Sequence, residues 1–151
     1  MKLVFTPHGV SIEEQLLAFN SPINEWEMVL GPCDRYYSED LIMIWDQLGI
    51  SCLVHDENPS KCYQLSVKLS EEQVVDIDPM FSFDGIVQIH DHIIDFLDKD
   101  SSLALFEIFD SKGGHFYNSI DLGEYSLVLV VDEWKIESLI YYKRKKDTNQ
   151  A

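Results

Sequence analysis

The feature that most constrains the fold of this chain is an order of short segments that occurs twice along it. Two strand-like runs, a short helix and three more strand-like runs fill residues 1–70, and the same order returns over residues 85–142. An internal repeat indicates that each copy is one supersecondary unit, which buries its apolar face with its neighbour's help. The sequence therefore predicts an α+β fold of two tandem β-β-α-β-β-β repeats, each a short helix packed on an antiparallel sheet.

The expected helices and strands follow from spacing and punctuation. Ser21 is the expected cap of the first helix, with Pro22 at its first position and Gly31 as its stop signal. Residues 62–69 alternate between apolar and polar side chains, so one face of that sheet should be dry and the other wet. The helices are expected at 21–30 and 103–109, and the strands at 2–5, 10–14, 41–45, 48–55, 62–69, 86–89, 93–96, 116–120, 125–131 and 136–142.

Two segments fall outside the repeats. Residues 71–84 form an acidic connector that contains Pro79, and residues 143–151 form a basic and polar tail that begins with Lys143-Arg144-Lys145-Lys146. A single unit of about 70 residues buries little surface by itself, so we expect both repeats to share one compact body. They can do so by sharing a core or by joining edge to edge, and edge joining would remove exposed strand edges.

Charge is the strongest signal in the composition. The chain has 27 acidic against 11 basic residues, a formal net charge of −16. Such a surface repels nucleic acid and anionic membranes, and it accelerates encounters with a basic protein partner. The alternative is that acidity only keeps the protein in solution. We expect no nucleic-acid or membrane partner.

The chain carries no obvious address signal. No apolar run approaches the roughly 18–20 residues that span a bilayer, and the apolar run at residues 3–5 is too short for a secretory signal. Cys33, Cys52 and Cys62 are odd in number and irregularly spaced, which is typical of buried free thiols rather than a disulfide framework. Both observations predict a cytoplasmic protein, and we expect no cofactor.

His90 and His92 are the candidate metal ligands. On a continuous strand, alternate residues share a face, so both imidazoles would reach one ion, with Asp95 or His115 as a third ligand. The alternative follows from the repeat: the equivalent segment of the first copy is a hairpin turn at residues 6–9, and a turn would separate the two rings.

Two acidic loops that carry aromatic residues are the candidate partner-binding surface. An aromatic anchor surrounded by charge is typical of interface hot spots, although the rings can instead fold back onto the core. One loop holds Trp134 with Asp132, Glu133 and Glu137, and the other holds Tyr36 and Tyr37 with Glu39 and Asp40.

Three motifs carry a family resemblance, namely Leu30-Gly31-Pro32, Trp45-Asp46-Gln47-Leu48-Gly49-Ile50 and Phe83-Asp84-Gly85-Ile86. They resemble the tandem repeat of β-lactamase-inhibitor-like folds and an uncharacterised bacterial family with these motifs in this order. The likeness runs from about residue 2 to residue 142. In size, charge and expected compartment the chain is also similar to immunity proteins of bacterial toxin systems.

Together these observations favour a non-catalytic, acidic protein that binds a basic partner. In its most concrete form it is a cytosolic immunity protein that occludes the active site of a basic toxin or nuclease. The alternatives are a metal-dependent hydrolytic enzyme that uses His90 and His92, and a scaffold module of unknown ligand.

Overall fold

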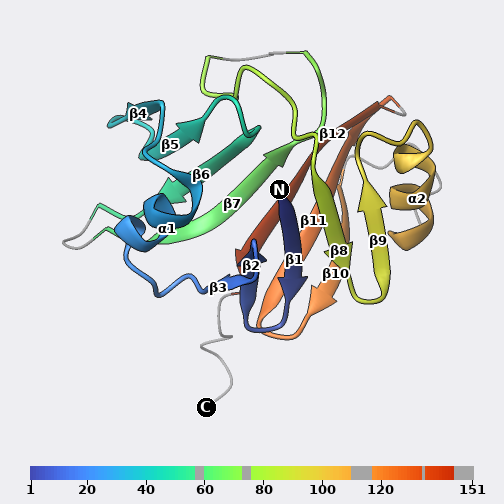
Figure 1. Ribbon diagram of the computed structural model, residues 1–151, viewed down its shortest axis with the longest axis horizontal. Helices are drawn as coiled ribbons and strands as arrows, with labels where there is room; N and C mark the ends of the chain where they lie inside the picture. Colours follow the sequence, from blue (N-terminus) through green and yellow to red (C-terminus); the bar gives the residue numbers. More distant parts are fainter. Residues whose placement is uncertain (57–59, 73–75, 110–116, 134, 145–151) are drawn as a thin grey trace.

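The computed structural model describes residues 1–56, 60–72, 76–109, 117–133 and 135–144. In this part the chain forms two β-sheets and two short helices, so the fold is mostly β within the expected α+β class (Figure 1). The helices are α1 (Ile23–Leu30) and α2 (Ser101–Ile108). The five-stranded sheet has the order β3 (Gln15–Leu17), β2 (Gly9–Ile12), β1 (Lys2–Thr6), β8 (Ile86–Ile89), β9 (His92–Asp95).

The larger sheet has seven strands. Its order is β10 (Tyr117–Leu122), β11 (Tyr125–Asp132), β12 (Lys135–Lys143), β7 (Cys62–Lys68), β6 (Ile50–Val54), β5 (Ile42–Trp45), β4 (Arg35–Tyr37).

Strands from both halves of the chain contribute to each sheet. β1 pairs with β8, and β7 pairs with β12, so the two halves join edge to edge, as one of the two expected arrangements has it. The strands of each half are divided between the two sheets, however, and do not form one sheet for each repeat. The β1–β8 pair is also parallel, whereas antiparallel pairing was expected throughout. Pairing of this kind satisfies backbone groups that two separate small sheets would leave exposed at their edges.

The core lies between the two sheets, with α1 and α2 at opposite sides of the molecule (Figure 1). An aromatic cluster joins the layers: the rings of Phe5 on β1 and Tyr141 on β12 lie 5.0 Å apart. Tyr141 stacks on Tyr125 at 4.8 Å, and its hydroxyl donates to the carbonyl of Thr6 at 2.5 Å. Phe19 contacts Tyr125, Tyr141 and Trp26 of α1, which links the helix to the seven-stranded sheet.

The alternation expected at residues 62–69 is confirmed for most of β7. Leu65 and Val67 are fully buried against the five-stranded sheet, while Gln64 and Ser66 are half-buried on the other face. Lys68 lies on the polar face, yet its side chain is buried, because the segment that follows β7 folds back over it.

The helix boundaries differ slightly from the expected ones. Ser21 does not cap α1; instead the Ile23 amide donates to the carbonyl of Ser60 at 2.8 Å, which satisfies one of the free amides of the first turn. Gly31, at φ +87°, ends α1 as expected. Among the described residues, neither helix is long and apolar enough to cross a membrane.

The strands β3 and β4 were not expected. Each has only three residues, which is too short for an alternating pattern to be recognised. Tyr36 and Tyr37 therefore lie on an edge strand rather than in a loop. The three cysteines are free, with Cys52 and Cys62 buried and Cys33 half-buried, which confirms the expectation of unpaired thiols.

Candidate partner-binding site

The acidic connector crosses the outer face of the seven-stranded sheet, the face turned away from the core. Arg35, on the edge strand β4, holds it there. The Nε and Nη2 atoms of Arg35 donate to the two carboxylate oxygens of Asp46 at 2.9 and 2.6 Å. Its Nη1 and Nη2 atoms also donate to the carbonyls of Asp76 and Asp78 at 2.7 and 2.8 Å. One guanidinium thus joins the sheet to two points of the connector.

Asp46 receives further bonds that hold it in its ionised form. The Met80 amide donates to its Oδ1 atom at 2.9 Å. Burial of the carboxyl favours protonation, but the hydrogen bonds from Arg35 and Met80 and the nearby charge of Lys68 outweigh burial, so the pKa of Asp46 lies below its ordinary value of 3.8. The carboxylate and its partners therefore form a charge-assisted clamp on the connector.

Lys68 provides the second clamp. Its Nζ donates to the carbonyl of Pro79 at 2.8 Å, and the amide of Phe83 donates to the carbonyl of Lys68 at the same distance. Gly49 makes room for this crossing, because a Cβ atom at Gly49 would lie 2.4 Å from the backbone nitrogen of Phe83. The connector thus has no helix or strand in its described part, yet it is fixed at several points.

The clamps present a row of carboxylates along the connector and at the turn between β11 and β12, which together we call the acidic corner. The connector meets the start of β12 here, since the amides of Leu69 and Ser70 donate to the carbonyl of Glu137 at 2.9 and 3.1 Å. The members of the acidic corner are Glu71, Glu72, Asp76, Asp78, Asp132, Glu133 and Glu137. All are exposed except Asp78 and Glu137, which are half-buried.

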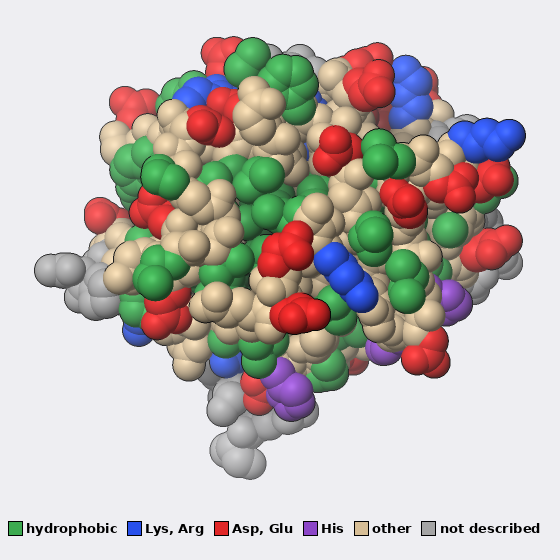
Figure 2. Space-filling view, viewed as in Figure 1, with side chains coloured by type: hydrophobic (Ala, Val, Ile, Leu, Met, Phe, Trp, Pro, Cys, Tyr) green, Lys and Arg blue, Asp and Glu red, His purple; other side chains and the backbone are tan. Residues whose placement is uncertain are grey.

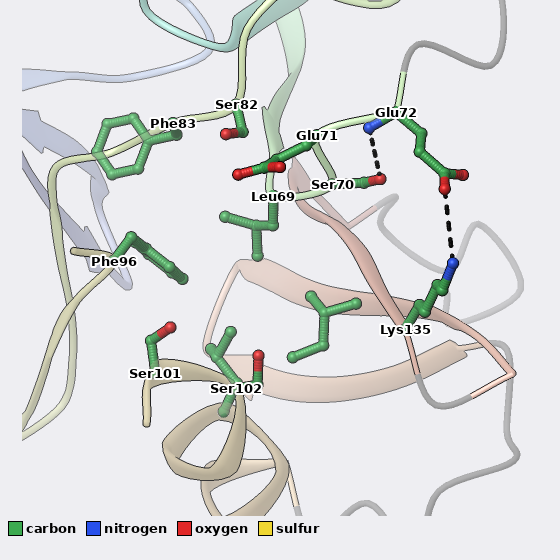
Figure 3. Close-up of a pocket in the computed structure, with 12 residues that line it drawn as sticks. Leu69, Ser70, Glu71, Glu72, Ser82, Phe83, Phe96, Ser101, Ser102 and Lys135 are labelled. Atoms are coloured by element: carbon green, nitrogen blue, oxygen red, sulfur yellow. Dashed lines mark hydrogen bonds and ion pairs between the residues drawn. The ribbon is translucent and has the colours of Figure 1, made fainter. Parts of the chain in front are cut away.

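Two hollows flank the connector at this corner. The first, of about 290 Å³, lies between the connector and the outer face of the sheet, and Glu72, Asp78 and Glu137 contribute carboxylates to its lining. The second, of about 500 Å³, lies on the other side, toward α2 (Figure 3). There Ser101 and Ser102 of α2 face Glu71 across the hollow, while Glu72 forms an exposed ion pair with Lys135 at 3.5 Å.

The structure brings most of the expected partner-binding residues to the region that the connector spans. Asp132, Glu133 and Glu137 belong to the acidic corner, whereas Trp134 lies outside the described residues. The second group, Tyr36, Tyr37, Glu39 and Asp40, lies at β4 or just after it. Three strands separate β4 from β12 in the sheet, which places the two groups roughly 19 Å apart at ordinary strand spacing.

The two aromatic residues of the second group differ in their surroundings. The Tyr36 side chain is 51% exposed, as an anchor for a partner would be. Tyr37 is half-buried, and its hydroxyl accepts a hydrogen bond from Nη1 of Arg35 at 3.0 Å. The interpretation of a ring that folds back therefore fits Tyr37 and does not fit Tyr36.

The two histidines do not form the shared face that a metal site requires. His90 lies in the two-residue turn between β8 and β9, at φ +54°, and His92 begins β9. The continuous strand is thus wrong, and the hairpin-turn alternative is confirmed for this segment. Over the residues that the structure describes, no three His, Cys, Asp or Glu side chains are placed to hold a metal ion. His115 lies outside those residues.

Sequence reasoning missed the residues that organise the site, namely Arg35, Asp46 and Lys68. One signal pointed to them: bases are few, 11 against 27 acids, so each base outside the C-terminal run is a candidate to hold an acidic segment in place. Which acid pairs with which base depends on the order of the strands in the sheet, and local sequence patterns do not predict that order. Lys143 and Arg144, expected at the start of the basic tail, belong to the folded body, since β12 continues through Lys143 and Arg144 pairs with Asp121.

The comparisons with known proteins identify a family without a described activity. A family model described as "Domain of unknown function (DUF7738)" matches residues 2–104, which include the connector and extend into α2. No curated protein and no solved structure matches the chain.

Proposed function

We propose that this chain, which belongs to the DUF7738 family of unknown function, binds a basic protein partner through the acidic corner. The observation that supports the proposal most is what the cations of Arg35 and Lys68 bind. Arg35 and Lys68 are bonded to carbonyls of the connector, and Arg35 also pairs with Asp46. They therefore stabilise the backbone of the corner, whose exposed carboxylates face solvent or a partner; Glu72 among them also forms an exposed ion pair with Lys135.

The net charge of −16 supports the same proposal on a longer range. Figure 2 shows Asp and Glu side chains spread over the face that it draws, with few Lys and Arg side chains between them. A field of this sign attracts a basic protein and orients it before contact. The acidic corner then supplies short-range complementarity, because the hydrogen bonds at Asp76, Asp78 and Pro79 reduce the conformational entropy that binding has to remove.

The most concrete form of the proposal is a cytosolic immunity protein. A basic nuclease binds the phosphates of its substrate through Lys and Arg side chains, and an array of fixed carboxylates is complementary to the same side chains. The acidic corner would occlude such an active site without any chemical step. A non-catalytic role is part of this proposal.

A two-copy origin of the fold also belongs to the proposal. It is supported by the order of elements after residue 85, where two strands, a helix and three strands follow one another as they do in the first half, apart from the short β3 and β4. Superposition of residues 2–68 on residues 86–143 in an experimental structure tests this origin. It would be contradicted if α1 and α2 did not coincide.

The binding proposal is tested by co-expression of the tagged chain with the products of its neighbouring genes. We expect a basic protein to be retained at low salt and to dissociate as salt rises, since exposed charge pairs are screened. Retention of no basic protein at low salt would overturn the proposal.

A matched pair of variants locates the binding surface. The corner variant neutralises four members of the acidic corner: Glu71→Gln, Glu72→Gln, Glu133→Gln and Glu137→Gln. The control variant removes the same charge from exposed positions elsewhere: Glu14→Gln, Glu25→Gln, Asp91→Asn and Glu107→Gln. We expect the corner variant to lose the partner and the control variant to retain it. Equal loss in both variants would show that overall charge, and not the corner, holds the partner.

A further inference from the structure

The outer face of the seven-stranded sheet carries apolar side chains although no helix or sheet of the described chain packs on it. Strand register places Val128 opposite Ile140, Ile140 opposite Ser66, and Ser66 opposite Ser51. The next row contains Tyr142, Gln64 and Leu53. All of these side chains except Ser51 are half-buried, which places aliphatic and aromatic groups at an accessible surface.

This face is hollowed along its length. The 290 Å³ hollow beneath the connector and a second hollow of about 410 Å³ share Gln64 and Ile140 in their linings. A third hollow, of about 680 Å³, shares Gln64 and Tyr142 with the second. The three hollows thus adjoin one another at shared side chains. We call the strip of the outer face that they border the outer furrow; it is lined by Leu53, Gln64, Ser66, Val128, Ile140 and Tyr142.

The charges at the two ends of the outer furrow differ. At the connector end three carboxylates, those of Glu72, Asp78 and Glu137, line the hollow beside two described cations: Lys68, which is bonded to Pro79, and Lys135, which pairs with Glu72. At the opposite end, within the part of the chain that the structure describes, Lys143 pairs with Glu124 and Arg144 pairs with Asp121. An apolar floor with one anionic end is complementary to a segment that is apolar along one side and basic at one end.

From this complementarity we infer that the outer furrow binds an amphipathic, basic helix of the partner protein, an inference that rests on the proposed function. The four strands from β6 to β11 span roughly 14 Å at ordinary spacing, and a helix with its side chains is about 10–12 Å wide. The apolar side of the helix contacts Val128 and Ile140, and its Lys or Arg side chains reach Glu137. Helix-in-groove binding of this kind combines apolar anchors at helical spacing with charge at the rim.

The test uses two fluorescein-labelled Leu/Lys peptides of about 14 residues, a length sufficient to form a helix on a surface. In the first peptide the Leu residues share one helical face; in the second the same residues are shuffled so that they do not. Fluorescence anisotropy measures the Kd of each peptide at low salt. We expect the amphipathic peptide to bind about tenfold more tightly than the shuffled one, because only it can bury its Leu side chains together.

Two conservative double variants identify the surface. Val128→Thr with Ile140→Thr keeps the β-branched shape and removes apolar surface from the furrow. Val4→Thr with Ile86→Thr makes the same change at half-buried positions of the five-stranded sheet. We expect the first pair to raise the Kd of the amphipathic peptide about tenfold and the second to change it less than about threefold. Circular dichroism confirms that each variant is folded.

The outcomes separate this inference from the function on which it rests. Equal binding of both peptides, with no effect of Val128→Thr and Ile140→Thr, would overturn the furrow and leave the acidic corner as the binding surface. Absence of binding by either peptide at low salt would overturn both.

Discussion

The clamp between Arg35 and Asp46 provides the sharpest test of the structural account. Replacing Asp46 by Asn removes the charge and keeps the shape, which leaves Arg35 without its carboxylate partner. Removal of one partner from a fully buried ion pair costs about 3–5 kcal/mol. The side chains of Asp46 and Arg35 are 10% and 26% exposed, so partial hydration reduces the cost. We therefore expect Asp46→Asn to lower the free energy of unfolding by about 2–3 kcal/mol.

Urea denaturation at pH 7, followed by tryptophan fluorescence, measures this loss. The control is Asp40→Asn, an exposed acid in the same half of the sheet, which should change stability by less than about 0.5 kcal/mol. A loss below about 0.5 kcal/mol in Asp46→Asn would refute the clamp.

The same variant predicts a pH dependence. Because the pKa of Asp46 is lowered in the folded state, its stabilising effect is present above the ordinary value of 3.8 and is lost as the pH falls toward the lower, folded value. The difference between wild type and Asp46→Asn should therefore be full at pH 7 and shrink below pH 3.8. A difference that stays constant into acid would contradict the assignment of the pKa.

Three further predictions concern the core and the connector. Gly49→Ala should destabilise the protein by more than about 2 kcal/mol, because the new Cβ atom would lie 2.4 Å from the connector backbone. Gly31→Ala, also at positive φ but with open space around it, should cost only about 1 kcal/mol. Thermal melts of both variants measure the difference. Burial raises the pKa of the Tyr141 hydroxyl, so stability should fall as the pH rises above its ordinary value of 10.0, and Tyr141→Phe should remove that dependence. Thiol titration should modify Cys33 in the native state and the buried Cys52 and Cys62 only after unfolding.

Local signals in the sequence predict the elements of this fold well. Both helices and the longer strands lie within a few residues of their expected positions, because apolar spacing and the stop at Gly31 are local properties. Trp26 and Leu30 are buried at the four-residue spacing of one helical face, and Leu105 and Phe109 are buried at the same spacing in the second half. The short strands β3 and β4 escaped recognition because their pairing arises from neighbours in the sheet.

Pairing between strands that are distant in the sequence is the part of the fold that local sequence patterns do not predict. The parallel contact between β1 and β8 joins segments about 80 residues apart, and the sequence of neither segment indicates which strand it pairs with. Lys68 illustrates the same limit: alternation places it on the polar face, and only the return of the connector over that face buries it. The candidate site depends on long-range structure in the same way, since only the fold brings Arg35 within hydrogen-bond distance of Asp46, Asp76 and Asp78.

The most direct test of the acidic corner is a chemical-shift map of the 15N-labelled chain titrated with the basic protein retained in co-expression. The largest amide shifts should fall in the described connector and at residues 132–137, and the corner variant should abolish them. Shifts centred instead on β2, β1, β8 and β9, the strands of the opposite sheet, would contradict this prediction.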